Sequence, residues 1–200
     1  MVCDRWRCVV FGVSLGIMDG AGGAAGGSYE SIQTITATAG QTSATFNSIP
    51  STYKHLQIRS ICRDNTGAAA GSDALYVQFN SDSGTNYAYH GLKGNGSTAS
   101  AYGAASQNLM LADGGTVGGG TASNVFGVSI IDIQDYSSTT KNKTIRCFSG
   151  ANRNVADTND YLVLNSGLWL STSSITSIKL STSVNSLALG SVFSLYGIKG

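Results

Sequence analysis

The residue types that most often carry chemistry in proteins are few in this chain and lie scattered along it. The 200 residues include two histidines and four cysteines, which are His55, His90, Cys3, Cys8, Cys62 and Cys147. No two cysteines have the C-x-x-C spacing of a zinc site, and the motifs of serine hydrolases, zinc proteases and P-loop enzymes are missing. The sequence therefore predicts a protein that is not an enzyme, with no metal site and no cofactor.

Two of the cysteines are expected to act as small buried hydrophobic residues. Cys62 and Cys147 each follow apolar residues at the two-residue spacing of one strand face. A disulfide between them is possible only if their strands are neighbours, since the two Cα atoms must approach within a few ångströms. Cys3 and Cys8 could pair with each other, but nothing in the sequence requires it.

The acidic residues also fit structural roles better than catalysis. Glu30 is the single glutamate. Six aspartates beside turn-forming residues are predicted to build Asx turns, in which the carboxylate accepts backbone hydrogen bonds; they are Asp64, Asp73, Asp82, Asp113, Asp157 and Asp160. Asp132 differs because it lies in an apolar strand. It is expected to pair with a cation or to accept hydrogen bonds, in the core or at an interface.

Three further features could bind a ligand, and each has a simpler interpretation. Residues 80–86 offer oxygen ligands and a glycine but lack the closing acidic ligand of an EF-hand, so a plain loop is expected. Trp169 could be a stacking platform for a sugar, although packing in the core or at a subunit interface fits better. His90 could titrate near neutral pH, but an ordinary surface or core histidine is the default.

The charge composition excludes several classes of protein. Only 12% of the residues are charged, and 12 basic against 11 acidic residues give a net charge of +1. A nucleic-acid-binding protein would show a basic excess or stripe, and a helical bundle would be rich in Glu, Lys, Arg and Gln. The hydrophobic fraction of 42% is enough for a core. These values favour a polar, nearly uncharged, β-rich domain that binds no nucleic acid.

From residue 28 onward, short alternating runs are separated by turn residues. About ten such runs occur at intervals of 8–15 residues, from residues 31–36 to residues 192–198. This spacing is typical of an all-β sandwich or barrel. We therefore expect an all-β fold, a β-sandwich of jelly-roll type, over residues 28–200. In the second half, residues 113–121 are expected to be a glycine-rich loop.

The first 27 residues differ from the rest in composition. An 11-residue apolar stretch over residues 8–18 follows two arginines and precedes a Gly/Ala-rich stretch that predicts a flexible hinge. The stretch is too short for a transmembrane helix. We expect residues 1–27 to form an extended arm that packs on a partner subunit. A strand of the domain's own core and a secretory signal are the alternatives.

Several sequence blocks together resemble a structural-protein domain that is common in tailed bacteriophages of aquatic bacteria. They include Tyr-Glu-Ser-Ile at residues 29–32, the terminal Leu-Tyr-Gly-Ile-Lys-Gly at 195–200, and residues 49–59, 94–97, 124–127, 131–133, 141–145 and 166–169. The resemblance covers about residues 29–200 and leaves out the arm. Members are virion or tail-fibre proteins, so the resemblance implies a component of the virus particle without giving its position there.

The composition, the arm and the resemblance lead to one expectation. We expect a capsid decoration (cement) protein on the outer surface of a phage head, a trimeric homo-oligomer without membrane contact that is assembled in the host cytoplasm. Its partners would be the major capsid protein and other virion subunits, which it would bind through arm residues Trp6, Val9, Val10, Phe11, Leu15 and Ile17. The alternative is the tip of a tail fibre. Such a tip would bind a host receptor or surface glycan with loop 113–121 or with aromatics such as Tyr102.

Overall fold

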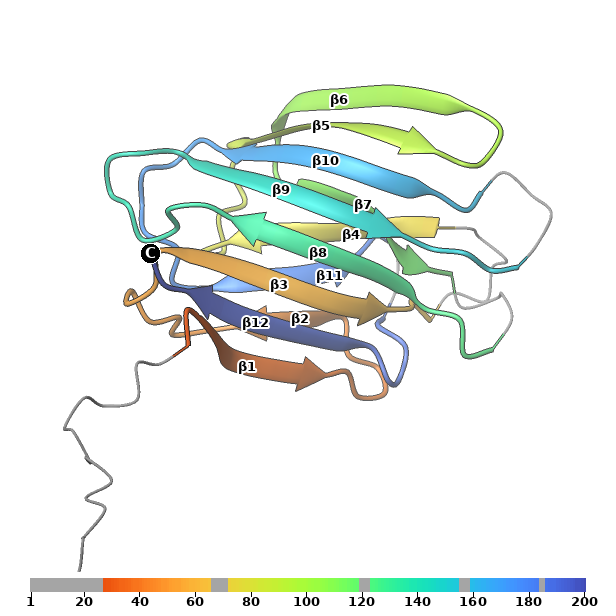
Figure 1. The fold of residues 1–200 in the computed structure, drawn as a ribbon, viewed down its shortest axis with the longest axis horizontal. Helices are drawn as coiled ribbons and strands as arrows, with labels where there is room; N and C mark the ends of the chain where they lie inside the picture. The colour runs from red at the N-terminus through yellow and green to blue at the C-terminus, as the bar shows by residue number, and fades with distance from the viewer. Residues whose placement is uncertain (1–26, 66–71, 119–122, 155–158, 184–185) are drawn as a thin grey trace, which may run out of the picture.

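The chain folds into two antiparallel β-sheets that pack face to face (Figure 1). The computed structural model describes residues 27–65, 72–118, 123–154, 159–183 and 186–200, and these hold twelve strands and no helix. The strands are β1 (Tyr29–Thr36), β2 (Ser43–Phe46), β3 (His55–Cys62), β4 (Ser72–Phe79), β5 (Tyr87–Gly94), β6 (Ala99–Gln107), β7 (Met110–Val117), β8 (Gly127–Ile133), β9 (Lys143–Gly150), β10 (Leu162–Trp169), β11 (Ile178–Thr182) and β12 (Val192–Ile198).

The two sheets differ in size. One has eight strands in the order β1-β12-β3-β8-β9-β10-β5-β6, and the other has four in the order β2-β11-β4-β7. In the view of Figure 1 the larger sheet lies in front of the smaller one. Along the chain, most strands are followed by a strand of the other sheet. The hairpins β5–β6 and β9–β10 are exceptions: both of their strands belong to the larger sheet and widen it.

The core fills the space between the sheets because alternate residues of each strand point inward. In β3, for example, Leu56, Ile58 and Cys62 are fully buried, while Ile61 and Arg59 point outward. From the smaller sheet, strands β2, β4 and β11 contribute Phe46, Leu75, Val77, Phe79, Ile178 and Leu180, all fully buried. The expectation of an all-β fold is thus confirmed.

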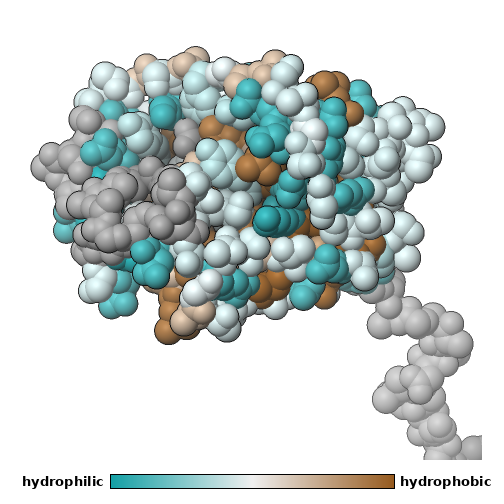
Figure 2. All heavy atoms as spheres, turned by 180° about the vertical axis from the view of Figure 1, so that it is seen from behind, coloured by the Kyte–Doolittle hydropathy of each residue, from teal (hydrophilic) through white to brown (hydrophobic). Residues whose placement is uncertain are grey.

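The side of the molecule opposite to that of Figure 1 is largely hydrophilic. Seen from there, polar and weakly polar residues cover most of the surface, and hydrophobic residues occur in small separate patches (Figure 2). The outward positions of the four-stranded sheet agree, since Thr45, Gln78, Lys179 and Ser181 alternate with core residues. This is the pattern of a sheet with one face on the core and the other in water.

The expectation for the start of residues 113–121 was wrong. These residues were expected to form a loop, but β7 includes residues 113–117. β7 runs against the larger sheet at Gly114 and Gly115, where an added Cβ atom would lie 2.7 Å from Val163 and 2.1 Å from the Ser129 hydroxyl. The glycines therefore allow a close approach between sheets rather than a turn. Asp73 and Asp113 accordingly lie in strands β4 and β7, not in turns.

Gly197 offers a test of the packing on β12. A Cβ atom there would lie 2.3 Å from ring carbon Cγ of Tyr53, which lies against the core. We expect Gly197→Ala to lower the free energy of unfolding by about 1–3 kcal/mol, because the ring must be displaced. In the control Gly94→Ala, the nearest atom to the new methyl group is 3.8 Å away. Urea unfolding of both variants checks this, and equal stabilities would contradict the packing described.

Candidate interaction surface

The outer face of the eight-stranded sheet has a row of large apolar side chains that runs across four neighbouring strands. Ile130 of β8 pairs with Phe148 of β9, Phe148 with Leu164 of β10, and Leu164 with Leu92 of β5. Their exposed fractions lie between 40% and 62%. Because the pairing register places them directly side by side, they form one continuous apolar row.

Three further apolar side chains form a second row, two residues along the strands from the first. Ile61 of β3 pairs with Val128 of β8. Val128 pairs in turn with Gly150 of β9, and Gly150 pairs with Leu162 of β10. We call the seven residues the outer apolar face: Ile61, Leu92, Val128, Ile130, Phe148, Leu162 and Leu164. They expose on the order of 600 Å² of apolar surface, the upper end for the largest patch on a monomeric protein.

Parts of strands β8 and β9 have large apolar side chains on both faces. In β8, Ile131 and Ile133 are buried in the core, while Val128 and Ile130 between them point outward. In β9, the buried Cys147 and Ile145 alternate with the outward Phe148. Continuous apolar residues are typical of strands that are buried on both faces, and residues 130–131 and 147–148 have this character.

A hollow of about 790 Å³ opens on the outer apolar face beside Leu164 and Leu92. His90, Arg146 and Ser166 line its other side, and Tyr102 of β6 contributes to its wall. The Tyr102 hydroxyl donates a hydrogen bond to Oδ1 of the buried Asn165, which itself donates to the backbone of Leu111 in β7, so the Tyr102 side chain lies on the inner side of the sheet. The outer apolar face is therefore concave at this point.

A polar row borders the apolar one. Asp132 accepts hydrogen bonds from Arg146 of β9 and from Gln57 of β3, at 2.9 and 2.8 Å. Beyond Gln57, the guanidinium group of Arg59 lies over the rings of Tyr29 and Tyr196. The expectation that Asp132 pairs with a cation is confirmed, and the pair lies on the outer face of the sheet rather than in the core.

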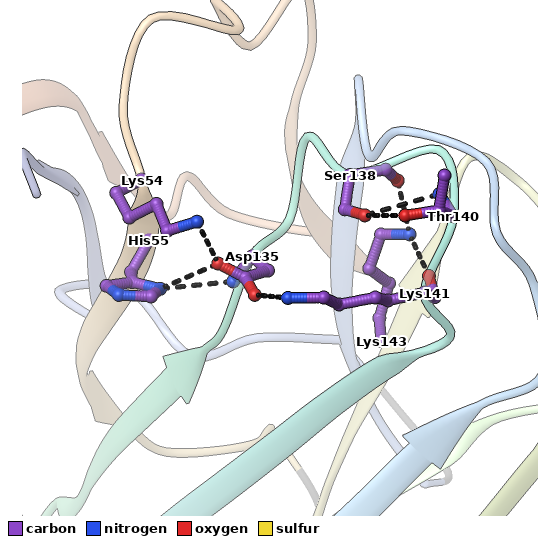
Figure 3. A network of polar contacts seen from close by, with 7 residues as sticks. All are labelled: Lys54, His55, Asp135, Ser138, Thr140, Lys141 and Lys143. Carbon is purple, nitrogen blue, oxygen red and sulfur yellow. Dashed lines mark hydrogen bonds and ion pairs between the residues drawn. The ribbon is translucent and has the colours of Figure 1, made fainter.

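The strongest ionic cluster lies at the end of the sheet where β3 and β8 meet. Asp135 is 2.7 Å from Nζ of both Lys54 and Lys141, and its backbone N–H donates to Nδ1 of His55 (Figure 3). Hydrogen bonds from Lys141 and then Lys54 hold the pKa of the Asp135 carboxyl well below its usual range. Lys141 belongs to the β8–β9 loop, so the cluster fixes that loop to the start of β3.

A second aspartate holds a loop against the core. Asp82 accepts hydrogen bonds from the backbone of Gly84, from Asn86 and from Nε1 of Trp169. These hydrogen bonds, led by that of Trp169, lower its pKa. The predicted Asx turn is confirmed here, as is the plain loop over residues 80–86, since the carboxylate is already engaged by protein donors.

The remaining candidates are structural. Trp169 is 2% exposed and packs against Phe79 and Tyr87, so it belongs to the core and is no sugar platform. Cys62 and Cys147 are buried on β3 and β9, which β8 separates, and no disulfide joins them.

Two other aspartates differ from the expected Asx turns. Asp64 is buried in a β-bridge with Leu187. Asp160 pairs with Arg153 at 2.6 Å. Asp157 lies outside the described residues, as do Cys3, Cys8 and the six arm residues proposed to bind a partner.

The described part of the chain has neither a metal-binding cluster nor a membrane-spanning helix. It contains no group of three or more His, Cys, Asp or Glu side chains arranged to hold a metal ion. The same residues include no helix of the length and hydropathy needed to cross a membrane. Comparison with protein-family models, curated proteins and solved structures gave no significant match.

The Asp135 cluster predicts a specific pH dependence. A carboxyl group whose pKa is lowered by folding stabilises the protein above its unfolded pKa of about 4, and this contribution is lost as the pH falls toward the folded pKa. We expect Asp135→Asn to be less stable than wild type at pH 7, with the difference shrinking below about pH 4. Urea midpoints between pH 7 and pH 2 measure it.

Asn suits this test because the backbone of residue 135 has φ of 46°, which Asn tolerates. A stability difference that stays constant down to pH 2 would contradict the ionic origin of the contribution.

Proposed function

We propose that this protein is a non-catalytic structural component of a tailed-phage virion, a capsid decoration protein on the outer surface of the head. The observation that carries the proposal is the outer apolar face. An exposed apolar area of this size marks a site of protein–protein contact, and the chain has it on a domain whose core is already complete. The assignment to a virion comes from the sequence blocks that resemble phage structural proteins.

The order of the strands supports the jelly-roll type of sandwich as part of this proposal. Setting aside the hairpins β5–β6 and β9–β10, eight strands remain, four in each sheet. The first pairs with the eighth, the second with the seventh, the third with the sixth and the fourth with the fifth. This nested pairing is that of a long hairpin rolled into two sheets, an architecture that viral capsid domains use.

The two hairpins are what distinguish this chain from a plain eight-stranded roll. They continue the larger sheet from β8 through β9, β10 and β5 to β6. Four of the seven residues of the outer apolar face, Phe148, Leu162, Leu164 and Leu92, belong to them. The extension therefore provides most of the proposed contact surface.

In this proposal the protein works mechanically. Area buried between copies and across junctions of the shell would resist the pressure of the packaged DNA. Residues 1–27 would bind the major capsid protein or neighbouring copies, and the trimer expected from the sequence would repeat the contact to raise avidity. The polar outer side of the four-stranded sheet would then face solvent.

The alternative position is the tip of a tail fibre, where the hollow beside Tyr102 would take a host glycan. The number of copies per particle separates the two positions. A number that matches the capsomers of the head supports decoration, whereas a number that matches the tail fibres contradicts it. Quantitative gel densitometry of purified particles measures it.

Removal of residues 1–27 tests the role of the arm. We expect the truncated chain to lose binding to heads that lack the protein, because the apolar anchor is gone, while its far-UV circular dichroism and unfolding midpoint stay close to those of the full chain. Co-sedimentation with the heads measures binding. Full occupancy by the truncated chain would contradict the proposed anchor.

A further inference from the structure

We propose that the outer apolar face is the contact between two copies of this chain, related by a two-fold axis that runs parallel to the strands between β9 and β10. This inference builds on the proposed assembly role by naming the partner of the face. Its test uses the purified chain without any capsid, so the two proposals can fail independently.

The apolar row is symmetric about the boundary between β9 and β10. Phe148 and Leu164 lie on either side of that boundary, and Ile130 and Leu92 lie one strand further out. A two-fold axis along the strands turns β9 onto β10 and β8 onto β5. It therefore places Phe148 on Leu164 of the second copy and Ile130 on Leu92 of the second copy, as a self-complementary interface requires.

The shape of the surface fits the same arrangement. The hollow lies beside Leu164 and Leu92 and reaches from Arg146 of β9 to Ala101 of β6, so it is centred on the β10–β5 half of the face. The other half has the largest side chain of the row, Phe148. Under this axis the Phe148 ring of each copy meets the hollow of the other, so the contact fills two hollows at once and brings the packing closer to that of a protein core.

The bordering charges select this axis over the perpendicular one. With the axis along the strands, Asp132 meets His90 of the second copy and Arg146 meets Ser166, so no like charges face each other. An in-plane axis across the strands would instead place Asp132 on Val128 and Arg146 on Gly150. That arrangement would bury two charged groups against a valine and a glycine, neither of which offers a side-chain hydrogen bond, and the lost hydration costs free energy.

The area also suits a second copy. The apolar residues offer on the order of 600 Å² per copy, and the polar row raises this toward the roughly 800 Å² that each partner buries in a standard stable interface. Sheets that pack face to face in this aligned way are common in β proteins. The contact is two-fold, so through this face the chain forms a dimer and not the trimer expected from the sequence.

Sedimentation equilibrium of the full-length chain over a concentration series tests the dimer. We expect a monomer–dimer equilibrium in the wild type, weakened on the order of 100-fold or more by the double substitution Phe148→Lys and Leu164→Lys. Both side chains are 49% exposed, so the core is not disturbed. Ser181→Lys, on the outer face of the four-stranded sheet, is the control and should dimerise as the wild type does.

Chemical cross-linking tests the axis itself. In a background with Cys3→Ser and Cys8→Ser, Ile130→Cys and Leu92→Cys are introduced singly and together, and a short bis-maleimide is added. The reagent is needed because packed sheets lie about 10 Å apart, beyond the reach of a disulfide. We expect a covalent dimer from the double variant and little from either single variant, since residue 130 of one copy faces residue 92 of the other across the axis.

Three results would overturn the inference. They are a wild type that stays monomeric at all concentrations, a dimer that survives the two lysines, and a dimer in which the single variants cross-link as well as the double one. A dimer that is lost when residues 1–27 are deleted, but unaffected by the lysines, would assign the contact to the arm and not to the face.

Discussion

Alternation across an antiparallel sheet is the constraint on which this structure depends. Each residue of a strand points either into the core or away from it, so a strand segment with large apolar side chains on both faces can be buried on both only if something covers each face. β8 and β9 contain such segments: Ile131 and Cys147 lie in the core, while Ile130 and Phe148 point outward. The four-stranded sheet covers one side only. The uncovered side then follows from the sequence and the sheet order together, and we propose that a partner covers it.

The polar clusters can be understood from the same constraint. Asp82 and Asp135 each accept hydrogen bonds or ion pairs at one end of the sandwich. Loops leave the sheets there, so the alternation of a strand no longer determines where a side chain points. They hold the hairpins at fixed positions, and the register of β8, β9 and β10 keeps the apolar row continuous. Function in this account comes from a rigid surface rather than from a reactive group.

Much of the fold could be predicted from the chain, for identifiable reasons. Period-two runs such as those around Leu56 and Val77 predicted the strands, and an indole in an apolar strand predicted a core role for Trp169. β6 and β7 could not be predicted, because Ala99–Gln107 has mostly small residues, with Tyr102 as its one large apolar side chain, and Gly114 and Gly115 suggest a turn. The outer face was missed since Leu92, Phe148 and Leu164 come together only through the strand order. A detectable signal was present in residues 128–133, which are apolar at both alternating sets of positions.

The central claim is that the outer apolar face is covered by protein when the chain is assembled. Solvent paramagnetic relaxation of methyl groups measures this directly, with a soluble paramagnetic agent and the full-length chain at dilute and at high concentration. The account predicts that the methyl groups of Ile130, Leu164 and Leu92 relax fast when dilute and become as protected as that of the buried Ile131 when concentrated. Methyl groups that remain as accessible at high concentration as in dilute solution would contradict it.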